Sequence, residues 1–203
     1  MLFYDSPNPA PNPRRVRIFA AEKGIELPTR EVSILEREQK SPEYLAINPR
    51  GQTPALQLDD GTVIAESVAI CRYLEALHPE PNLFGTTPEE IALVEMWNRR
   101  VEMIAMYPIG AVWVHTHRFT AALPGRNEAW GEANRAAVAK AFGFFDEALV
   151  DREFLAGERF TFADILLLTT VDFAVFAGCP PPESCTHLTA WHTRVSARPS
   201  ADA

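Results

Sequence analysis

The chain has 203 residues, of which 47% are hydrophobic, with a formal net charge of -8 and a pI near 5.2. This length can bury one sizeable core or two smaller ones, and the acidic balance argues against a nucleic acid or an anionic membrane as partner. The apolar segment Ile165 to Gly178 contains Asp172 and is shorter than the ~20 residues that a membrane span needs. No targeting segment precedes the first polar turn, so we expect a cytoplasmic protein.

Residues 1–33 predict a strand, a helix and a second strand. Leu2 to Tyr4 is a short apolar stretch, and a loop dense in Pro and Asn follows it. Asn12 precedes Pro13, which is the pattern of a capping residue followed by proline at the first helical position. Gly24 is suited to the end of that helix. We therefore expect a helix that begins at Asn12, with a second strand at residues 30–33.

Residues 41–78 predict a short helix, a hairpin and a longer helix. The expected segments are a helix opened by Ser41-Pro42, strands at 56–58 and 62–64 joined by an Asp-Asp-Gly turn, and an apolar helix over 68–77. The order βαβ, turn, ββα then completes an α/β unit near His78.

From residue 87 onward the patterns are helical. Thr87 and Glu90 form a capping box that opens the first long helix, which we expect to kink near Pro108. Thr161 and Asp164 form a second box, in a structural role, at the start of a helix that is apolar on nearly all sides. A second long helix is expected after residues 125–127, with Val138, Phe142, Phe145 and Leu149 facing inward, and a last short helix around Trp191 and Val195 is stopped by Pro199. The expected boundaries are 1–78 for an α/β domain, 79–86 for a linker and 87–203 for an all-helical domain.

Two motifs of the first half carry chemical information. Thr53-Pro54 stands at the entry to a strand, where a proline is tolerated because it need not donate to the ladder. Glu66-Ser67 stands at the start of the apolar helix, where free N–H groups and the helix dipole favour an anion. Either motif alone is common in proteins with no related function.

The set Asn-Pro-x-Gly-x-x-Pro-Ala-Leu followed by Glu-Ser resembles the thioredoxin-fold half of a cytosolic glutathione transferase, of the bacterial theta-like and nu-like classes. The resemblance implies a thioredoxin-like α/β N-terminal domain and an all-α C-terminal bundle. It also implies a cis Thr53-Pro54 bond that exposes the backbone of Thr53 to the cysteine of glutathione. Glu66 and Ser67 would bind the γ-glutamyl end, and Gln52 and Lys40 would contact the rest of the tripeptide.

The residue that stabilises the thiolate is less clearly marked. A thiol with a pKa near 8.5 is only a few per cent ionised at pH 7, so a transferase of this kind needs a donor beside the sulfur. The positions that hold serine in theta-like and zeta-like classes carry Ala10 and Pro11 here. Three candidates remain, in the order Asn12, Ser6, Tyr4. Asn12 matches the asparagine of the nu-like class, and its amide would add to the helix dipole.

The resemblance implies a homodimeric transferase that uses glutathione as co-substrate and attacks a small hydrophobic electrophile. No metal is expected, because the cysteines and histidines lack ligand spacing, and neither a nucleic acid nor a membrane is expected as partner. Two alternatives stay open. One is glutathione-dependent disulfide reduction, which the nu-like Asn12 suggests. The other is a non-catalytic binding or regulatory module of the same fold.

Overall fold

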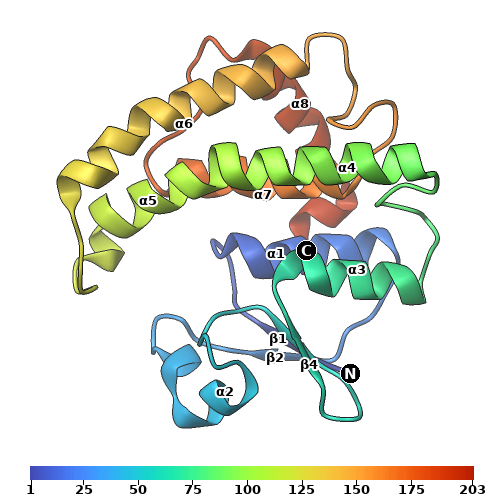
Figure 1. Ribbon diagram of the computed structural model, residues 1–203, viewed down its shortest axis with the longest axis vertical. Coiled ribbons are helices and arrows are strands. Elements are labelled where there is room, and N and C mark those ends of the chain that lie inside the picture. The colour runs from blue at the N-terminus through green and yellow to red at the C-terminus, as the bar shows by residue number, and fades with distance from the viewer. The chain divides into compact units, whose positions relative to one another are not determined.

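The computed structural model describes all 203 residues, which form two compact units. One unit contains residues 1–83 together with 199–203, and the other contains residues 84–198. The sheet belongs to the first unit, and the second is helical (Figure 1). The expected succession of an α/β unit and an all-helical unit is therefore confirmed.

The first unit is built on a four-stranded sheet. Its elements are β1 (Leu2–Asp5), α1 (Pro11–Glu22), β2 (Thr29–Glu31), η1 (Glu38–Lys40), α2 (Pro42–Ile47), β3 (Ala55–Gln57), β4 (Val63–Ala65), α3 (Ser67–Leu77) and η4 (Pro199–Asp202). The strand order is β2-β1-β3-β4, with only the β1 and β2 pair parallel. Helices α1 and α3 lie on one side of the sheet, and α2 lies on the other (Figure 1). The α2 side has its own small core of Tyr4, Val32, Tyr44 and Ala55.

The start of α1 differs from the expectation. The helix begins at Pro11, and its N-cap is Ala10, which has no side chain that could cap. Asn12 is therefore the second helical residue and not the cap. Because the first N–H groups of a helix have no partner within it, both Pro11 and Pro13 fit its first turn. The second strand is also displaced, to residues 29–31 from the expected 30–33.

Long-range contacts place the boundaries of the α/β unit differently from the expected ones. Lys23 Nζ donates to the carbonyls of His78 and Pro81, at 2.6 and 2.7 Å, so the first part of the expected linker is held against the sheet domain. The tail, expected with the helical domain, packs on α1: Arg14 donates to the carbonyl of Ala201 at 2.9 Å. No local pattern in the sequence marks either contact.

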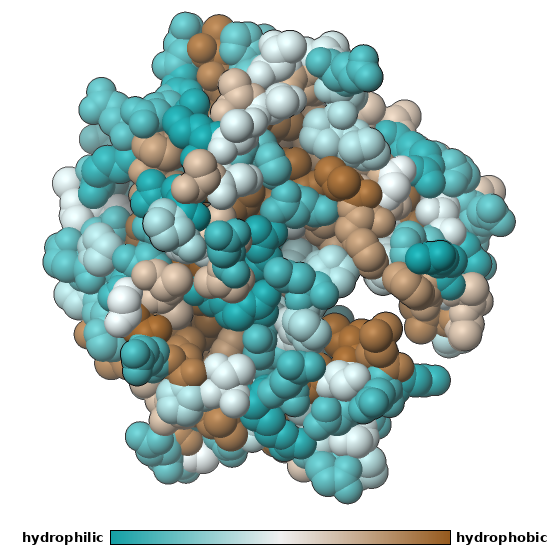
Figure 2. Space-filling view, turned by 180° about the vertical axis from the view of Figure 1, so that it is seen from behind, coloured by the Kyte–Doolittle hydropathy of each residue, from teal (hydrophilic) through white to brown (hydrophobic).

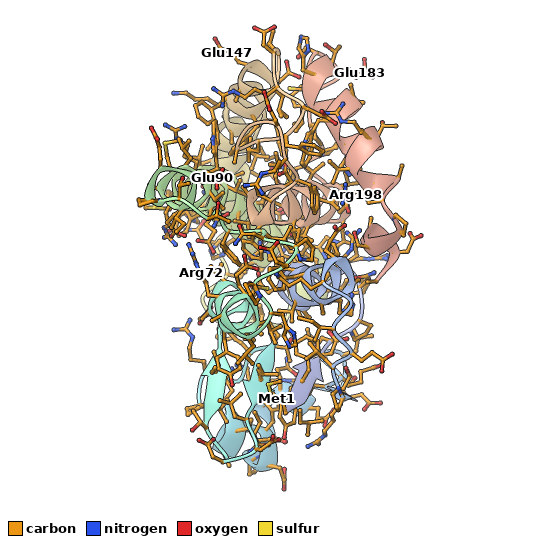
Figure 3. The ribbon with its side chains drawn as sticks, turned by 90° about the vertical axis from the view of Figure 1, so that its right-hand side faces the viewer. Met1, Arg72, Glu90, Glu147, Glu183 and Arg198 are labelled. Carbon is orange, nitrogen blue, oxygen red and sulfur yellow. The ribbon has the colours of Figure 1, made fainter.

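The second unit is a bundle of helices. Its elements are α4 (Pro88–Arg100), the π-helical turn η2 (Val101–Met106), α5 (Tyr107–Thr116), η3 (Arg118–Thr120), α6 (Glu128–Ala148), α7 (Phe162–Phe176) and α8 (Thr186–Ser196). The expected capping box is present at α4, where Glu90, labelled in Figure 3, accepts from Thr86 and Thr87. A kink was expected near Pro108, and the structure has the π-helical turn η2 just before it. Since Pro108 has no N–H, the helix cannot continue its regular bonding through this point.

Helix α7 forms the centre of the bundle, with twelve buried residues among its fifteen. Asp164 at its start is fully buried and accepts hydrogen bonds from the backbone N–H of Leu155 (2.9 Å), the backbone N–H of Thr161 (3.0 Å) and Trp191 Nε1 (3.1 Å). Burial raises the pKa of this carboxyl to about 6. The structural role expected for Thr161 and Asp164 is confirmed.

The surface mixes polar residues with smaller groups of hydrophobic ones, which appear brown among teal in Figure 2. The exposed apolar side chains include Leu35, Met103, Tyr107, Phe119 and Val175. None of the helices combines the length and the hydropathy that crossing a membrane would require.

Candidate functional site

The loop before β3 presents a fixed peptide edge. The Thr53-Pro54 bond is cis, as the resemblance implied. The preceding carbonyl, that of Gln52, accepts from both the Tyr44 hydroxyl and Asn48 Nδ2, each at 2.8 Å. The backbone hydrogen bonds of this segment do not use the N–H or the C=O of Thr53. These two groups therefore remain available to a peptide-like ligand.

Glu66 and Ser67 stand at the N-terminus of α3, as the sequence predicted. Glu66 is the N-cap and has φ 70° and ψ 120°, a left-handed conformation that costs a residue with a Cβ about 1 to 3 kcal/mol. Its side chain is exposed, whereas Ser67 is buried, with 5% of its surface exposed. This turn leaves the carboxylate accessible beside the free N–H groups of the helix, so a carboxylate and an anion site lie next to each other.

The start of α1 contains a hydrogen bond that links it to the start of α3. Arg15 is 3% exposed, and its Nη1 donates to Asn12 Oδ1 at 2.5 Å. The same nitrogen lies 3.4 Å from Ser67 Oγ, which makes a long hydrogen bond. Asn12 and Ser67 are thus joined through one guanidinium group.

The other two thiolate candidates have their hydroxyl protons engaged. Ser6 is fully buried and donates to the Val32 carbonyl at 2.8 Å, so the hydroxyl of Thr53, 2.9 Å away, is the donor in their shared bond. The Tyr4 hydroxyl donates to Gln57 Oε1 at 3.0 Å, inside the core. Because a hydroxyl has a single proton, neither group can donate to a sulfur without breaking these bonds. Asn12 is the candidate whose two amide N–H groups these contacts leave unused.

Arg50 brings the remaining predicted residues together. Its Nε lies 3.1 Å from Gln52 Oε1 and 3.9 Å from Glu66 Oε1, and its carbonyl accepts from Lys40 Nζ at 3.1 Å. Gly51, with φ +57°, makes this approach possible, since a Cβ there would lie 2.6 Å from the carbonyl oxygen of residue 39. Lys40, Gln52 and Glu66 therefore line one exposed, mixed-charge region.

Comparison with known proteins identifies the family. The model of the glutathione S-transferase N-terminal domain matches residues 10–77, and that of the C-terminal domain matches residues 104–199. Glutathione S-transferase 2 of Saccharomyces cerevisiae is 37% identical over 98% of this chain and 87% of its own length. The chain belongs to the glutathione S-transferase family.

Solved structures of transferases agree with this assignment over the whole chain. The crystal structure of Gtt2 from Saccharomyces cerevisiae matches with a TM-score of 0.94 and 36% identity, covering 100% of this chain and 99% of that one. A glutathione S-transferase domain-containing protein from Marinobacter aquaeolei matches with a TM-score of 0.93 and 38% identity, covering 98% and 99%. The glutathione S-transferase family, the fold and the enzyme class of transferase, all predicted from the sequence, are confirmed.

Two arginines of this glutathione S-transferase site were not predicted from the sequence. In the sequence, Arg15 is one of three cations between Arg14 and Arg17, and nothing there distinguishes it from an exposed residue, whereas the structure buries it beside Ser67. Arg50 lies inside the motif that carried the resemblance, at a position where the motif allows any residue. The contacts that join these arginines to Ser67 and Glu66 link residues far apart in the sequence, so no local pattern marks them.

The cysteines make none of the contacts described above. Cys71, Cys179 and Cys185 are all buried free thiols, and burial raises the pKa of each. The structure contains no group of three or more His, Cys, Asp or Glu side chains arranged to hold a metal ion.

Proposed function

We propose that this glutathione S-transferase family member binds glutathione in its α/β unit and adds the thiolate to a small hydrophobic electrophile. The observation that carries the proposal is the set of complementary groups in one unit: the available backbone of Thr53 before the cis-proline Pro54, the exposed Glu66 carboxylate, and the N-terminus of α3. A tripeptide with a zwitterionic end is the ligand that these groups fit.

The binding mode follows from charge and hydrogen-bond complementarity. The carboxylate of Glu66 attracts the γ-glutamyl ammonium, while Ser67 and the first N–H groups of α3 hold the γ-glutamyl carboxylate. The N–H and C=O of Thr53, beside Pro54, pair with the cysteinyl backbone as a short antiparallel ladder. Gln52 and Lys40 contact the glycine end. This arrangement directs the thiol toward the start of α1.

Asn12 supplies the chemical assistance. An amide N–H donated to the sulfur, together with the positive end of the α1 dipole, favours the thiolate over the thiol. The S–H proton passes to solvent, and the sulfur then forms a bond to the electrophilic carbon. The electron pair displaced there goes to a leaving group or, in an addition, to an atom that takes up a proton. Ser6 holds the Thr53 side chain in this scheme and does not contact the sulfur.

The same proposal includes a homodimer in the cytoplasm, with glutathione as co-substrate and no metal. Its support is the family to which the chain belongs.

Calorimetric titration of glutathione tests the proposal. Glu66→Ala and Ser67→Ala should each weaken binding by about tenfold or more, since hydrogen bonds to charged groups contribute roughly 1.5 to 3 kcal/mol. Glu43→Ala is a matched control, because Glu43 is also an exposed acid in the first turn of a helix of this unit. Equal affinities for all four proteins would refute the proposed site.

Turnover assays separate transfer from the alternatives. A halo-aromatic acceptor reports conjugation, and a mixed disulfide of glutathione reports disulfide reduction. Conjugation should be the faster reaction. A protein that binds glutathione and turns over neither substrate would be the non-catalytic module.

A further inference from the structure

Arg15 is the cation that lies between the two helix starts of the site. With Asp164 it is one of the two charged residues whose exposure falls in the buried range. Helices α1 and α3 lie side by side, and Figure 3 looks along them. The Arg15 side chain reaches from the second turn of α1 to Asn12 (2.5 Å) and to Ser67 on α3 (3.4 Å). A buried charge is costly unless it is held by hydrogen bonds, so both contacts belong to a defined arrangement.

The chemistry of the guanidinium group decides how Asn12 and Ser67 are oriented. All polar atoms of an arginine side chain are donors. Asn12 must therefore turn its carbonyl oxygen toward Arg15, which directs the two amide N–H groups away from it. Ser67 accepts through its oxygen, which leaves its only proton to donate elsewhere. Both partners of Arg15 consequently act as donors toward any group on their other side.

The ligand proposed for this site has acceptors at both places. A thiolate accepts hydrogen bonds and cannot donate, and the same holds for a carboxylate. Without Arg15, the Asn12 amide could rotate and present its oxygen, and the Ser67 hydroxyl could donate its proton to a protein acceptor. If the Asn12 oxygen faced the anion, it would repel it. If the Ser67 proton were donated elsewhere, the hydrogen bond to the anion would be lost.

We propose that Arg15 is a positioning residue that orients Asn12 as the donor to the thiolate and Ser67 as the donor to the γ-glutamyl carboxylate. The inference rests on the proposed function and extends it. One buried cation then links glutathione affinity to thiol activation. Loss of Ser67 alone should mainly weaken binding, and loss of Asn12 alone should mainly raise the thiol pKa, whereas loss of Arg15 should do both.

The test compares Arg15→Met and Arg15→Lys with wild type. Arg15→Lys keeps the charge but not the planar donor group, and it provides the same readouts should Arg15→Met fail to fold. Arg14→Met is the matched control, because Arg14 is the neighbouring arginine of α1 and bonds to the Ala201 carbonyl. Calorimetry measures the dissociation constant of glutathione, and the ultraviolet absorbance of the thiolate against pH measures the pKa of the bound thiol.

We expect Arg15→Met to weaken glutathione binding roughly tenfold and to raise the pKa of the bound thiol by about one unit. Arg15→Lys should change both quantities in the same direction, and Arg14→Met should change neither. In an Asn12→Ala background, Arg15→Lys should produce no further change in thiol pKa, since the group it orients is gone.

Two results would overturn the inference. One is a thiol pKa in both Arg15 variants equal to that of wild type, because a merely structural arginine would affect stability alone. The other is an undiminished pKa change by Arg15→Lys in the Asn12→Ala background, which would mean that the arginine acts on the sulfur directly. Ser67→Ala in the same titrations keeps the two proposals apart: if it also leaves affinity unchanged, the proposed glutathione site itself is refuted.

Discussion

Replacing Asn12 by aspartate should separate the stability of the fold from the activation of the thiol. Asn12 Oδ1 accepts from Arg15 at 2.5 Å, and an aspartate in the same rotamer would keep this acceptor and convert the contact into an ion pair. Its negative charge would also lie in the first turn of α1, where the helix dipole favours an anion by about 0.3 to 1 kcal/mol. The free energy of unfolding of Asn12→Asp should therefore equal or exceed that of wild type.

The same substitution removes both amide donors. One hydrogen bond to a charged group contributes roughly 1.5 to 3 kcal/mol, so its loss alone should raise the pKa of bound glutathione by about one to two units. The new carboxylate would add repulsion of the thiolate. Asn12→Asp should consequently raise the thiol pKa more than Asn12→Ala does, although the alanine variant is the less stable protein.

Denaturant unfolding, thiolate absorbance against pH, and turnover at two pH values measure these quantities. For both Asn12 variants, turnover should fall more at pH 6.5 than at pH 9, where a larger share of the thiol ionises unaided. A thiol pKa that is unchanged in Asn12→Asp would refute the role of the amide. If Ser6→Ala alone moved the titration, the serine would be the thiolate donor and its bond to Val32 would have to break in the complex.

Three further predictions concern the strained residue, the core and the assembly. Glu66→Ala and Glu66→Gly should lose glutathione affinity equally, but the glycine variant should be more stable than the alanine variant by about 1 kcal/mol, because glycine adopts φ 70° without strain; equal stabilities in urea would contradict this. Asp164→Ala should lose roughly 3 kcal/mol or more of unfolding free energy, since it leaves three buried N–H donors without an acceptor. Burial raises the pKa of Asp164 from 3.8 to about 6, so the folded protein binds the carboxyl proton more tightly than the unfolded chain does. The stability that this proton contributes is complete below pH 3.8 and is lost as the pH rises through 6. Asp164→Asn should not show this decline. Light scattering at micromolar concentration should give about twice the chain mass of 22.6 kDa, and a monomeric mass would count against the homodimer.

Helix starts were predictable wherever the capping bond closes within a few residues. Ser41 accepts from the N–H of Tyr44, and Thr161 and Asp164 bond reciprocally, as their spacing indicated. The N-cap of α1 was predicted two residues too late, at Asn12 and not at Ala10, because prolines at 11 and 13 both fit the first helical turn. Asn12 lies inside the first turn, where its side chain accepts from Arg15 and does not cap the helix, and Arg15 in turn contacts Ser67 of α3.

Most of the unusual backbone conformations could not be predicted from local sequence either. The cis bond at Thr53-Pro54 was foreseen only through the family resemblance, since most bonds before proline are trans. The positive φ of Glu66 has no counterpart in the sequence at all: glycine is the residue that marks such a conformation, and a glutamate there is held by the surrounding structure. The cis bonds at Asn8-Pro9 and Glu80-Pro81 were likewise not predicted.

The sequence could therefore show which groups would bind a ligand, but not what orients them. Glu66, Ser67 and Asn12 are visible as an acid, a hydroxyl and an amide near helix starts. Whether the hydroxyl and the amide donate to a ligand depends on the protein group that each one contacts on the side away from the ligand. Here that group is the guanidinium of Arg15, which is 52 residues from Ser67 in the sequence. A site for an anion requires donors, and a buried cation behind neutral groups is a physical means of ensuring that their oxygen atoms face inward and their protons face the ligand. The orientation of the site is thus a property of the contact between α1 and α3, and it should be lost with Arg15 even though every ligand-contacting residue remains.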